Sequence, residues 1–83
     1  VLVQYKHKVI PVEIKAGKTG TLRSLHSFID TSKDDTAIRL YAGKLEIIET
    51  ATPAGTPYKL LNLPYYLASK IPEYLEWMEN TEC

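Results

Sequence analysis

Two short motifs within residues 11–20, PVEIKAGKTG, carry residue types that could do chemistry. Gly17-Lys18-Thr19 matches the end of a phosphate-binding loop, which wraps phosphate in backbone amides. Glu13-x-Lys15 matches the carboxylate and lysine of a metal-dependent nuclease site, where a cation activates a water. The two interpretations place different demands on the residues before Gly17, so the sequence can separate them.

The phosphate-loop interpretation fails at position 12. The full motif needs a glycine five positions before Gly17, and that residue is Val12. Residues 12–15 alternate between apolar and charged, as a half-exposed strand does, and a strand cannot also form the arch of amides. We therefore interpret residues 17–20 as a turn between a strand and a helix, and we expect no nucleotide cofactor.

Glu13 and Lys15 lie on the same face of the predicted strand, with their α-carbons roughly 6.6 Å apart. The carboxylate suits a hard cation such as Mg²⁺, and the lysine could orient the attacking water. Magnesium normally takes a second carboxylate or a substrate phosphate, and this strand supplies one carboxylate only. The alternative interpretation is a half-exposed strand that carries a surface ion pair.

Apolar runs bounded by turn residues predict the elements that hold this pair. Their order is strand, strand, helix, strand, strand, strand and a C-terminal helical segment, which indicates a small α/β or α+β domain with a mixed sheet of about five strands. Pro64 suits the first position of a helix, and Pro72 predicts a break near Ile71. Pro11 donates no hydrogen bond, so its nitrogen should face a gap in the ladder or a bulge. The predicted strands are 1–5, 9–16, 36–42, 44–50 and 58–63, and the predicted helices are 22–31, 64–70 and 72–80.

The composition narrows the class of partner. Ten basic and ten acidic residues give no net charge, whereas a protein that coats nucleic acid usually carries a basic excess. Residues 1–25 nevertheless contain five Lys or Arg and one acid, and the tail from Glu73 carries four acids and no Lys or Arg. The basic start could meet a nucleic-acid backbone, meet the acidic tail of a neighbouring chain, or be solvated surface.

A single cysteine, Cys83, excludes a disulfide within the chain and fits a reducing compartment. No apolar run approaches the roughly 20 residues of a membrane span. We expect a cytoplasmic protein without a membrane partner. The chain begins at Val1 directly within a predicted strand, so we also expect a fragment of a longer protein. The chain should form one domain, with its core in residues 1–71 and a helical tail in residues 72–83.

Three strings together resemble a known family: VIPVEIKAGKTGTLRSLHSF, AIRLYAG and YKLLNLPYYLA. They are similar to the C-terminal domain, of unknown function, of a group of prokaryotic AAA-type ATPases, and the resemblance covers roughly residues 1–71. That domain is similar in fold to the PD-(D/E)xK, or restriction-endonuclease-like, nucleases. The resemblance implies an ATPase domain upstream and an acid on the first strand, in a pattern like Val-Asp-Phe. The first strand here, VLVQY, has no acid.

The resemblance implies that Glu13 would hold Mg²⁺ and Lys15 would orient the water. Lys18, Arg23 and His26 are candidate contacts to a nucleic-acid backbone, although a histidine off the apolar stripe of a helix is commonly a surface or cap residue.

Because the second acid is missing, we expect a non-enzymatic interaction or assembly module, with nucleic acid as one partner. One alternative is a Mg²⁺-dependent nuclease that acts on DNA. The other is a free-standing domain that forms a homo-oligomer through an open sheet edge or through its C-terminal aromatic residues, which are Tyr65, Tyr66, Tyr74 and Trp77.

Overall fold

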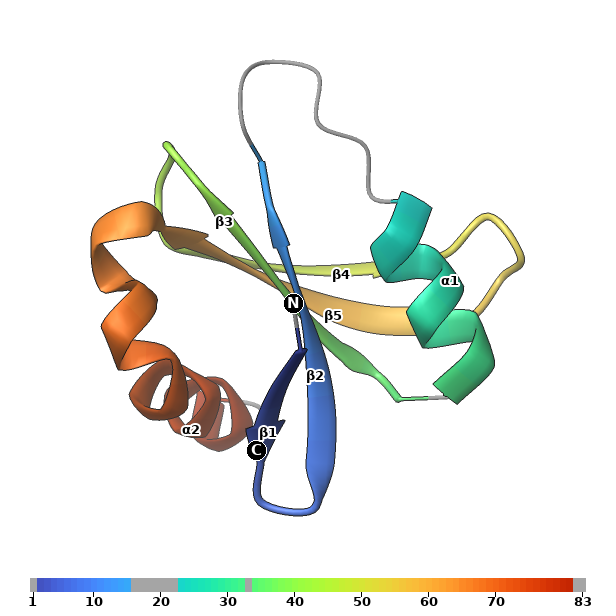
Figure 1. The fold of residues 1–83 in the computed structure, drawn as a ribbon, viewed down its shortest axis with the longest axis horizontal. Coiled ribbons are helices and arrows are strands. Elements are labelled where there is room, and N and C mark those ends of the chain that lie inside the picture. The colour runs from blue at the N-terminus through green and yellow to red at the C-terminus, as the bar shows by residue number, and fades with distance from the viewer. Residues whose placement is uncertain (1, 16–22, 33, 82–83) are drawn as a thin grey trace.

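The computed structural model describes residues 2–15, 23–32 and 34–81, and it has a mixed five-stranded sheet with a helix on each face (Figure 1). The predicted fold class, a mixed sheet with one helix after the Glu13–Lys15 strand and a C-terminal helical segment, is confirmed. In chain order the elements are β1 (Leu2–Tyr5), β2 (Lys8–Ile14), α1 (Arg23–Ser32), β3 (Thr36–Tyr41), β4 (Glu46–Ala51), β5 (Pro57–Pro64), the 3₁₀ helix η1 (Tyr65–Lys70) and α2 (Ile71–Thr81).

The strands are arranged in the order β1-β2-β3-β5-β4. The three inner strands β2, β3 and β5 run parallel, and the edge strands β1 and β4 pair antiparallel with their neighbours. Helix α1 covers one face of the sheet, and η1 and α2 cover the other (Figure 1). The carboxyl ends of β2, β3 and β5 therefore meet at one end of the sheet, and Glu13 lies there.

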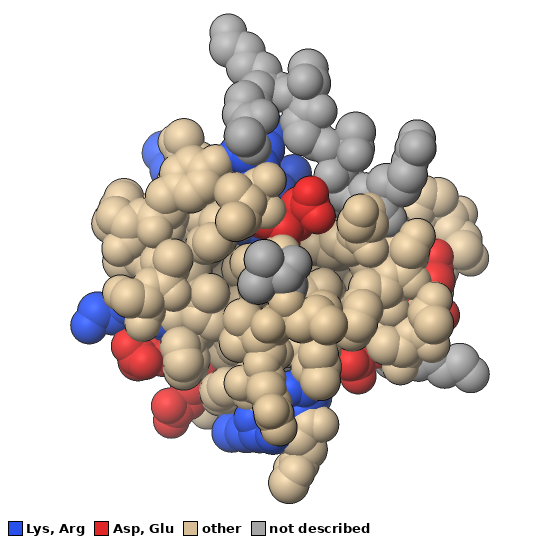
Figure 2. Space-filling model, in the orientation of Figure 1, with Lys and Arg blue, Asp and Glu red and all other residues tan. Residues whose placement is uncertain are grey.

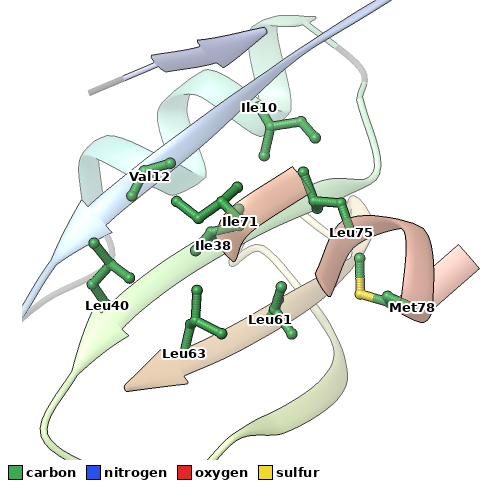
Figure 3. Packing of buried hydrophobic residues seen from close by; sticks show 9 residues of the cluster. All are labelled: Ile10, Val12, Ile38, Leu40, Leu61, Leu63, Ile71, Leu75 and Met78. Atoms are coloured by element: carbon green, nitrogen blue, oxygen red, sulfur yellow. The ribbon is translucent and has the colours of Figure 1, made fainter. Parts of the chain in front are cut away.

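The central strand β3 is apolar on both faces because each face packs against a helix. Ala37 and Ile38 are neighbours in sequence, and both are fully buried, one in each core. Val12 is also a core residue, with 6% of its surface exposed, which agrees with a strand at the position where a phosphate loop needs glycine. Residues 17–19 lie outside the described residues. Figure 3 shows the core between the sheet and α2, which contains Ile10, Val12, Ile38, Leu40, Leu61, Leu63, Ile71, Leu75 and Met78.

The β1–β2 hairpin turns at Lys6 and His7, between the predicted strands 1–5 and 9–16, and Tyr5 pairs with Lys8 across it. Lys6 adopts a left-handed backbone conformation, with φ of 56°. The ladder between β2 and β3 begins at Val12, so Pro11, which has no N–H, precedes it.

The C-terminal segment differs from the prediction in its first part. Pro64 ends β5 and caps η1, instead of opening an α-helix, and residues 65–70 form a 3₁₀ helix. The break near Ile71 is confirmed, since α2 begins there. Pro72 explains the difference, because in a continuous α-helix its ring would clash with the carbonyl of Ala68. That carbonyl accepts a shorter-range hydrogen bond from the N–H of Ile71 instead.

The loop between β4 and β5 is fastened to α1 by a threonine. The buried Thr52 donates its hydroxyl hydrogen to Asp30 of α1 at 2.7 Å, and its Oγ1 accepts from the N–H of Thr56 at 3.2 Å. Gly55 has a φ of 96°, a conformation that glycine adopts without strain, and its N–H reaches the Thr52 carbonyl. Thr52 thus joins this loop to the helix that follows the Glu13–Lys15 strand.

The hydrogen bond from Thr52 lowers the pKa of Asp30 below its ordinary value of 3.8, and a second hydrogen bond from Thr56 adds to the effect. A carboxyl group with a lowered folded-state pKa stabilises the fold above its unfolded pKa, and this contribution is lost as the pH falls through the folded pKa. We therefore expect Thr52→Val to lower the free energy of unfolding near neutral pH, by an amount that shrinks below pH 3.8. Urea unfolding over a series of pH values measures this difference.

The matched control is Thr50→Val, which removes an exposed hydroxyl from the same hairpin. Its effect on the free energy of unfolding should not depend on acid pH. Parallel pH profiles for the two variants would contradict the role assigned to Thr52.

Candidate functional site

Four polar side chains form a row across the sheet at the carboxyl ends of its parallel strands. The strand registers align them directly, one on each of β2, β3, β5 and β4. They lie on the α1 face, because Ala37 and Leu60, two residues earlier on β3 and β5, pack against α1. We call this set the polar row: Glu13, Arg39, Asn62 and Glu46.

The α1 face of the sheet is therefore divided into two halves. The apolar half lies beneath α1, and the polar row occupies the half at the carboxyl ends. Strand β2 leads to α1 on this face, whereas β5 leads to η1 and α2 on the opposite face (Figure 1). Ligands of α/β sheets bind at the carboxyl ends where the connections diverge in this way, so the polar row occupies a favourable place for a binding site.

Arg39 is held in one orientation by two neighbours. Its Nε–H donates to Oδ1 of Asn62 at 2.9 Å, and Asn62 is only 1% exposed. The guanidinium carbon lies 5.5 Å from the centre of the Tyr41 ring, within the range of a cation–π contact. A hydrogen bond to a buried amide is stronger than one at the surface, because little water competes for it.

Tyr41 is itself positioned by the turn that follows β3. Its hydroxyl donates to the carbonyl of Lys44 at 2.5 Å. A Cβ atom at Gly43 would lie 2.5 Å from the Tyr41 ring, far closer than two carbon atoms can approach. Only glycine at position 43 leaves room for the ring in this place, and the ring in turn supports Arg39.

Glu13 is half-buried and stands opposite Arg39 in the register, without an ion pair to any described residue. It also borders a small hollow of about 160 Å³ between α1 and the β1–β2 hairpin. The other residues that line the hollow are Leu2, Pro11, Val12, Ser24, Leu25 and Phe28.

Lys15 follows β2 directly and is fixed through its backbone. Its N–H donates to the carbonyl of Leu40, and its carbonyl accepts the hydroxyl hydrogen of Tyr65. Lys18 lies outside the described residues. Arg23 opens α1, and its side chain also lies outside the described part of the chain. The predicted nucleic-acid contacts at Lys18 and Arg23 stay predictions.

His26 faces the sheet. The half-buried ring shares a 2.8 Å hydrogen bond between Nε2 and the Tyr58 hydroxyl, and the two rings meet edge to face. Burial raises the pKa of the Tyr58 phenol above its ordinary value of 10.0, so the hydroxyl keeps its hydrogen at neutral pH. The predicted contact between His26 and nucleic acid would compete with this hydrogen bond.

The basic residues of the first quarter separate to opposite ends of β2. Lys6 pairs with Glu79 of α2 at 3.3 Å and Lys8 with Asp35 at 3.7 Å, both beside the β1–β2 turn. Lys15 lies at the other end of the strand. Figure 2 shows basic atoms gathered near the turn, at the lower end of the view, and acidic beside basic atoms near the end of β2. The acidic tail thus meets one of these lysines within the same chain.

The C-terminal aromatic residues make different contacts. The Tyr65 hydroxyl binds the end of β2, and Tyr74 packs on the core and against Trp77 with ring centres 6.0 Å apart. Tyr66 is 82% exposed and Trp77 is 42% exposed. Their predicted role in a homo-oligomer stays a prediction.

Glu13 is the residue of the polar row that could contribute a carboxylate to a Mg²⁺ site next to Lys15. Among residues 2–15, 23–32 and 34–81, no three His, Cys, Asp or Glu side chains come close enough to surround a metal ion.

Sequence reasoning missed Arg39 and Asn62. The available signal was one polar residue within each of two otherwise apolar strands, AIRLY and LLNLP, because such a residue must find a partner when it is buried.

Comparisons of the chain with protein-family models, with curated proteins and with solved structures found no match. No described helix is long and apolar enough to cross a membrane. Functional inference therefore rests on the geometry of the polar row.

Arg39→Met removes the donor that satisfies Oδ1 of the buried Asn62. We expect it to lower the free energy of unfolding by about 1–3 kcal/mol, the usual range when a buried polar atom loses its partner. Lys44→Met removes a positive charge from an exposed position in the following turn and should change stability by less than about 0.5 kcal/mol. Urea unfolding at neutral pH compares the two. Equal unfolding midpoints would show that the Arg39–Asn62 hydrogen bond does not stabilise the fold.

Proposed function

We propose that this chain is an interaction module of the kind found at the C-terminus of AAA-type ATPases, and that its polar row binds the phosphate backbone of DNA. One observation carries the proposal. Glu13 and Arg39 stand side by side at the carboxyl ends of β2 and β3, and Arg39 is oriented by the buried Asn62. A guanidinium held in place at such a position suits the recognition of a phosphate group.

Binding agrees with the position of Arg39 beside Glu13 better than metal-dependent cleavage does. Metal-dependent hydrolysis of a phosphodiester needs a cation held by carboxylates. Glu13 supplies one carboxylate, and the positive charge of Arg39 beside it disfavours a cation at the same place. Within the row, Arg39 is the member that suits a negatively charged group, while the two carboxylates give the row a formal charge of −1.

The order of elements supports the suggested family. The resemblance implies a hairpin whose second strand carries Glu13 and Lys15, then a helix packed on the sheet, then a strand beside the hairpin. The described chain has this order in β1, β2, α1 and β3, with β3 parallel to β2. Helix–strand domains of many functions share such an order, so the polar row carries the functional proposal.

Fluorescence anisotropy with labelled single-stranded and duplex DNA tests the proposal. We expect binding at about 50 mM salt that weakens at about 200 mM, because phosphate contacts release condensed counterions. Glu46→Gln, which removes a negative charge from the end of the row, should strengthen binding modestly. Absence of binding to both forms of DNA at low salt would refute the proposal.

A Mg²⁺-dependent nuclease is the second candidate. It is favoured by the hollow of about 160 Å³ beside Glu13, which leaves space next to the carboxylate. Plasmid incubated with Mg²⁺ or Mn²⁺ should remain intact if the chain only binds DNA. Cleavage that Glu13→Gln abolishes and Glu46→Gln retains would establish the nuclease instead. Cleavage that survives both substitutions would point to a contaminant.

A further inference from the structure

We infer that Arg39 is the residue of the polar row that binds one phosphate group, and that Asn62 and Tyr41 act as its positioning residues. The inference rests on the proposed function, because it names the group that anchors the DNA backbone. The phosphate could be an internal phosphodiester or a terminal 5′-phosphate, since both present two adjacent oxygens to a guanidinium.

The hydrogen bonds of Arg39 leave one edge of the guanidinium for a ligand. A guanidinium carries five N–H donors, and the one on Nε is used by Asn62. No hydrogen bond or ion pair joins the two terminal amino groups to another described residue. These groups form the fork that binds two phosphate oxygens in parallel. The bond to Asn62 therefore selects which edge of Arg39 is presented.

The Arg39 side chain is held in one orientation before any ligand binds. Asn62 is buried in the inner strand β5, and the Tyr41 ring is confined by Gly43 and by its hydrogen bond to Lys44. An arginine held at two points loses little further freedom when it binds a phosphate, whereas an exposed lysine must be immobilised. Arg39 should therefore contribute more to binding than the exposed lysines do.

The acids at both ends of the row limit what can bind. Glu13 and Glu46 flank Arg39 and Asn62 in the register, and both repel a second anion. A carboxylate also accepts hydrogen bonds, so Glu13 favours a ligand whose phosphate is joined to groups with O–H or N–H donors. The N–H groups of a nucleotide base are such donors. We expect the site to take a single phosphate of a nucleotide chain.

Two variants and one control test the inference by anisotropy. Arg39→Lys keeps the charge but loses the fork, and it should weaken DNA binding about 5- to 20-fold. Gly43→Ala keeps every charge but displaces the Tyr41 ring, and a loss of about threefold is expected. Lys70→Met removes an exposed charge from η1, on the other face of the sheet, and should change binding less than about twofold.

The same oligonucleotide with a 5′-phosphate or a 5′-hydroxyl distinguishes the two sources of phosphate. If Arg39→Lys weakens binding of both forms equally, Arg39 contacts an internal phosphodiester. If Arg39→Lys weakens binding of the 5′-phosphorylated form alone, Arg39 contacts the terminal phosphate. If Arg39→Lys fails to fold, as judged by circular dichroism, Gly43→Ala carries the comparison.

The outcomes separate this inference from the proposed function. If the wild type binds DNA and neither Arg39→Lys nor Gly43→Ala weakens binding more than Lys70→Met, the inference is overturned and the proposed function stands. If the wild type binds no DNA, the proposed function falls. The Arg39 Nε–Hε resonance, titrated with a mononucleotide, then decides the inference: a saturable shift supports it, and an unchanged resonance overturns it.

Discussion

Strands β2, β3 and β5 run parallel, so each connection between them must leave at the carboxyl end and return at the amino end. This requirement places α1 over one face of the sheet, while the helices after β5 cover the other. The inner strands are then buried on both sides, and the apolar residues of β3 form two cores at once. It also gathers the ends of β2, β3 and β5 in one place. The polar row exists because the parallel registers align its members there.

Asn62 has a structural role in this arrangement and a positioning role in the site that we propose. A buried amide in an apolar strand costs free energy unless it is hydrogen-bonded, and Arg39 satisfies its oxygen. The same bond orients the guanidinium. A polar pair in the middle of apolar strands departs from the local rule that buried strand positions are apolar, and such departures tend to occur at functional sites. A replacement that repacked this pair with apolar side chains could preserve the fold and still remove the site.

Much of the fold could be predicted from the sequence, because local patterns carry it. The alternation in PVEIK predicts β2, and the Ala37–Ile38 run predicts a strand buried on both sides. Proline chemistry predicts the break at Ile71, although the 3₁₀ form of residues 65–70 depends on a clash between Pro72 and Ala68 that only three dimensions make plain. The hydrogen-bonded pair of Arg39 and Asn62 was harder to foresee, because its two members are distant in sequence.

The sequence by itself determined the strands and the two α-helices, the burial of Val12 where a phosphate loop would need glycine, and the place of Glu13 near the end of a strand. Only the tertiary structure decided which side chains surround Glu13. Arg39 and Asn62 are 23 residues apart and meet because β3 and β5 are neighbours, with β4 outside them. His26 was similarly drawn to Tyr58 by the packing of α1. Strand order and register arise from long-range packing, and no local pattern encodes them.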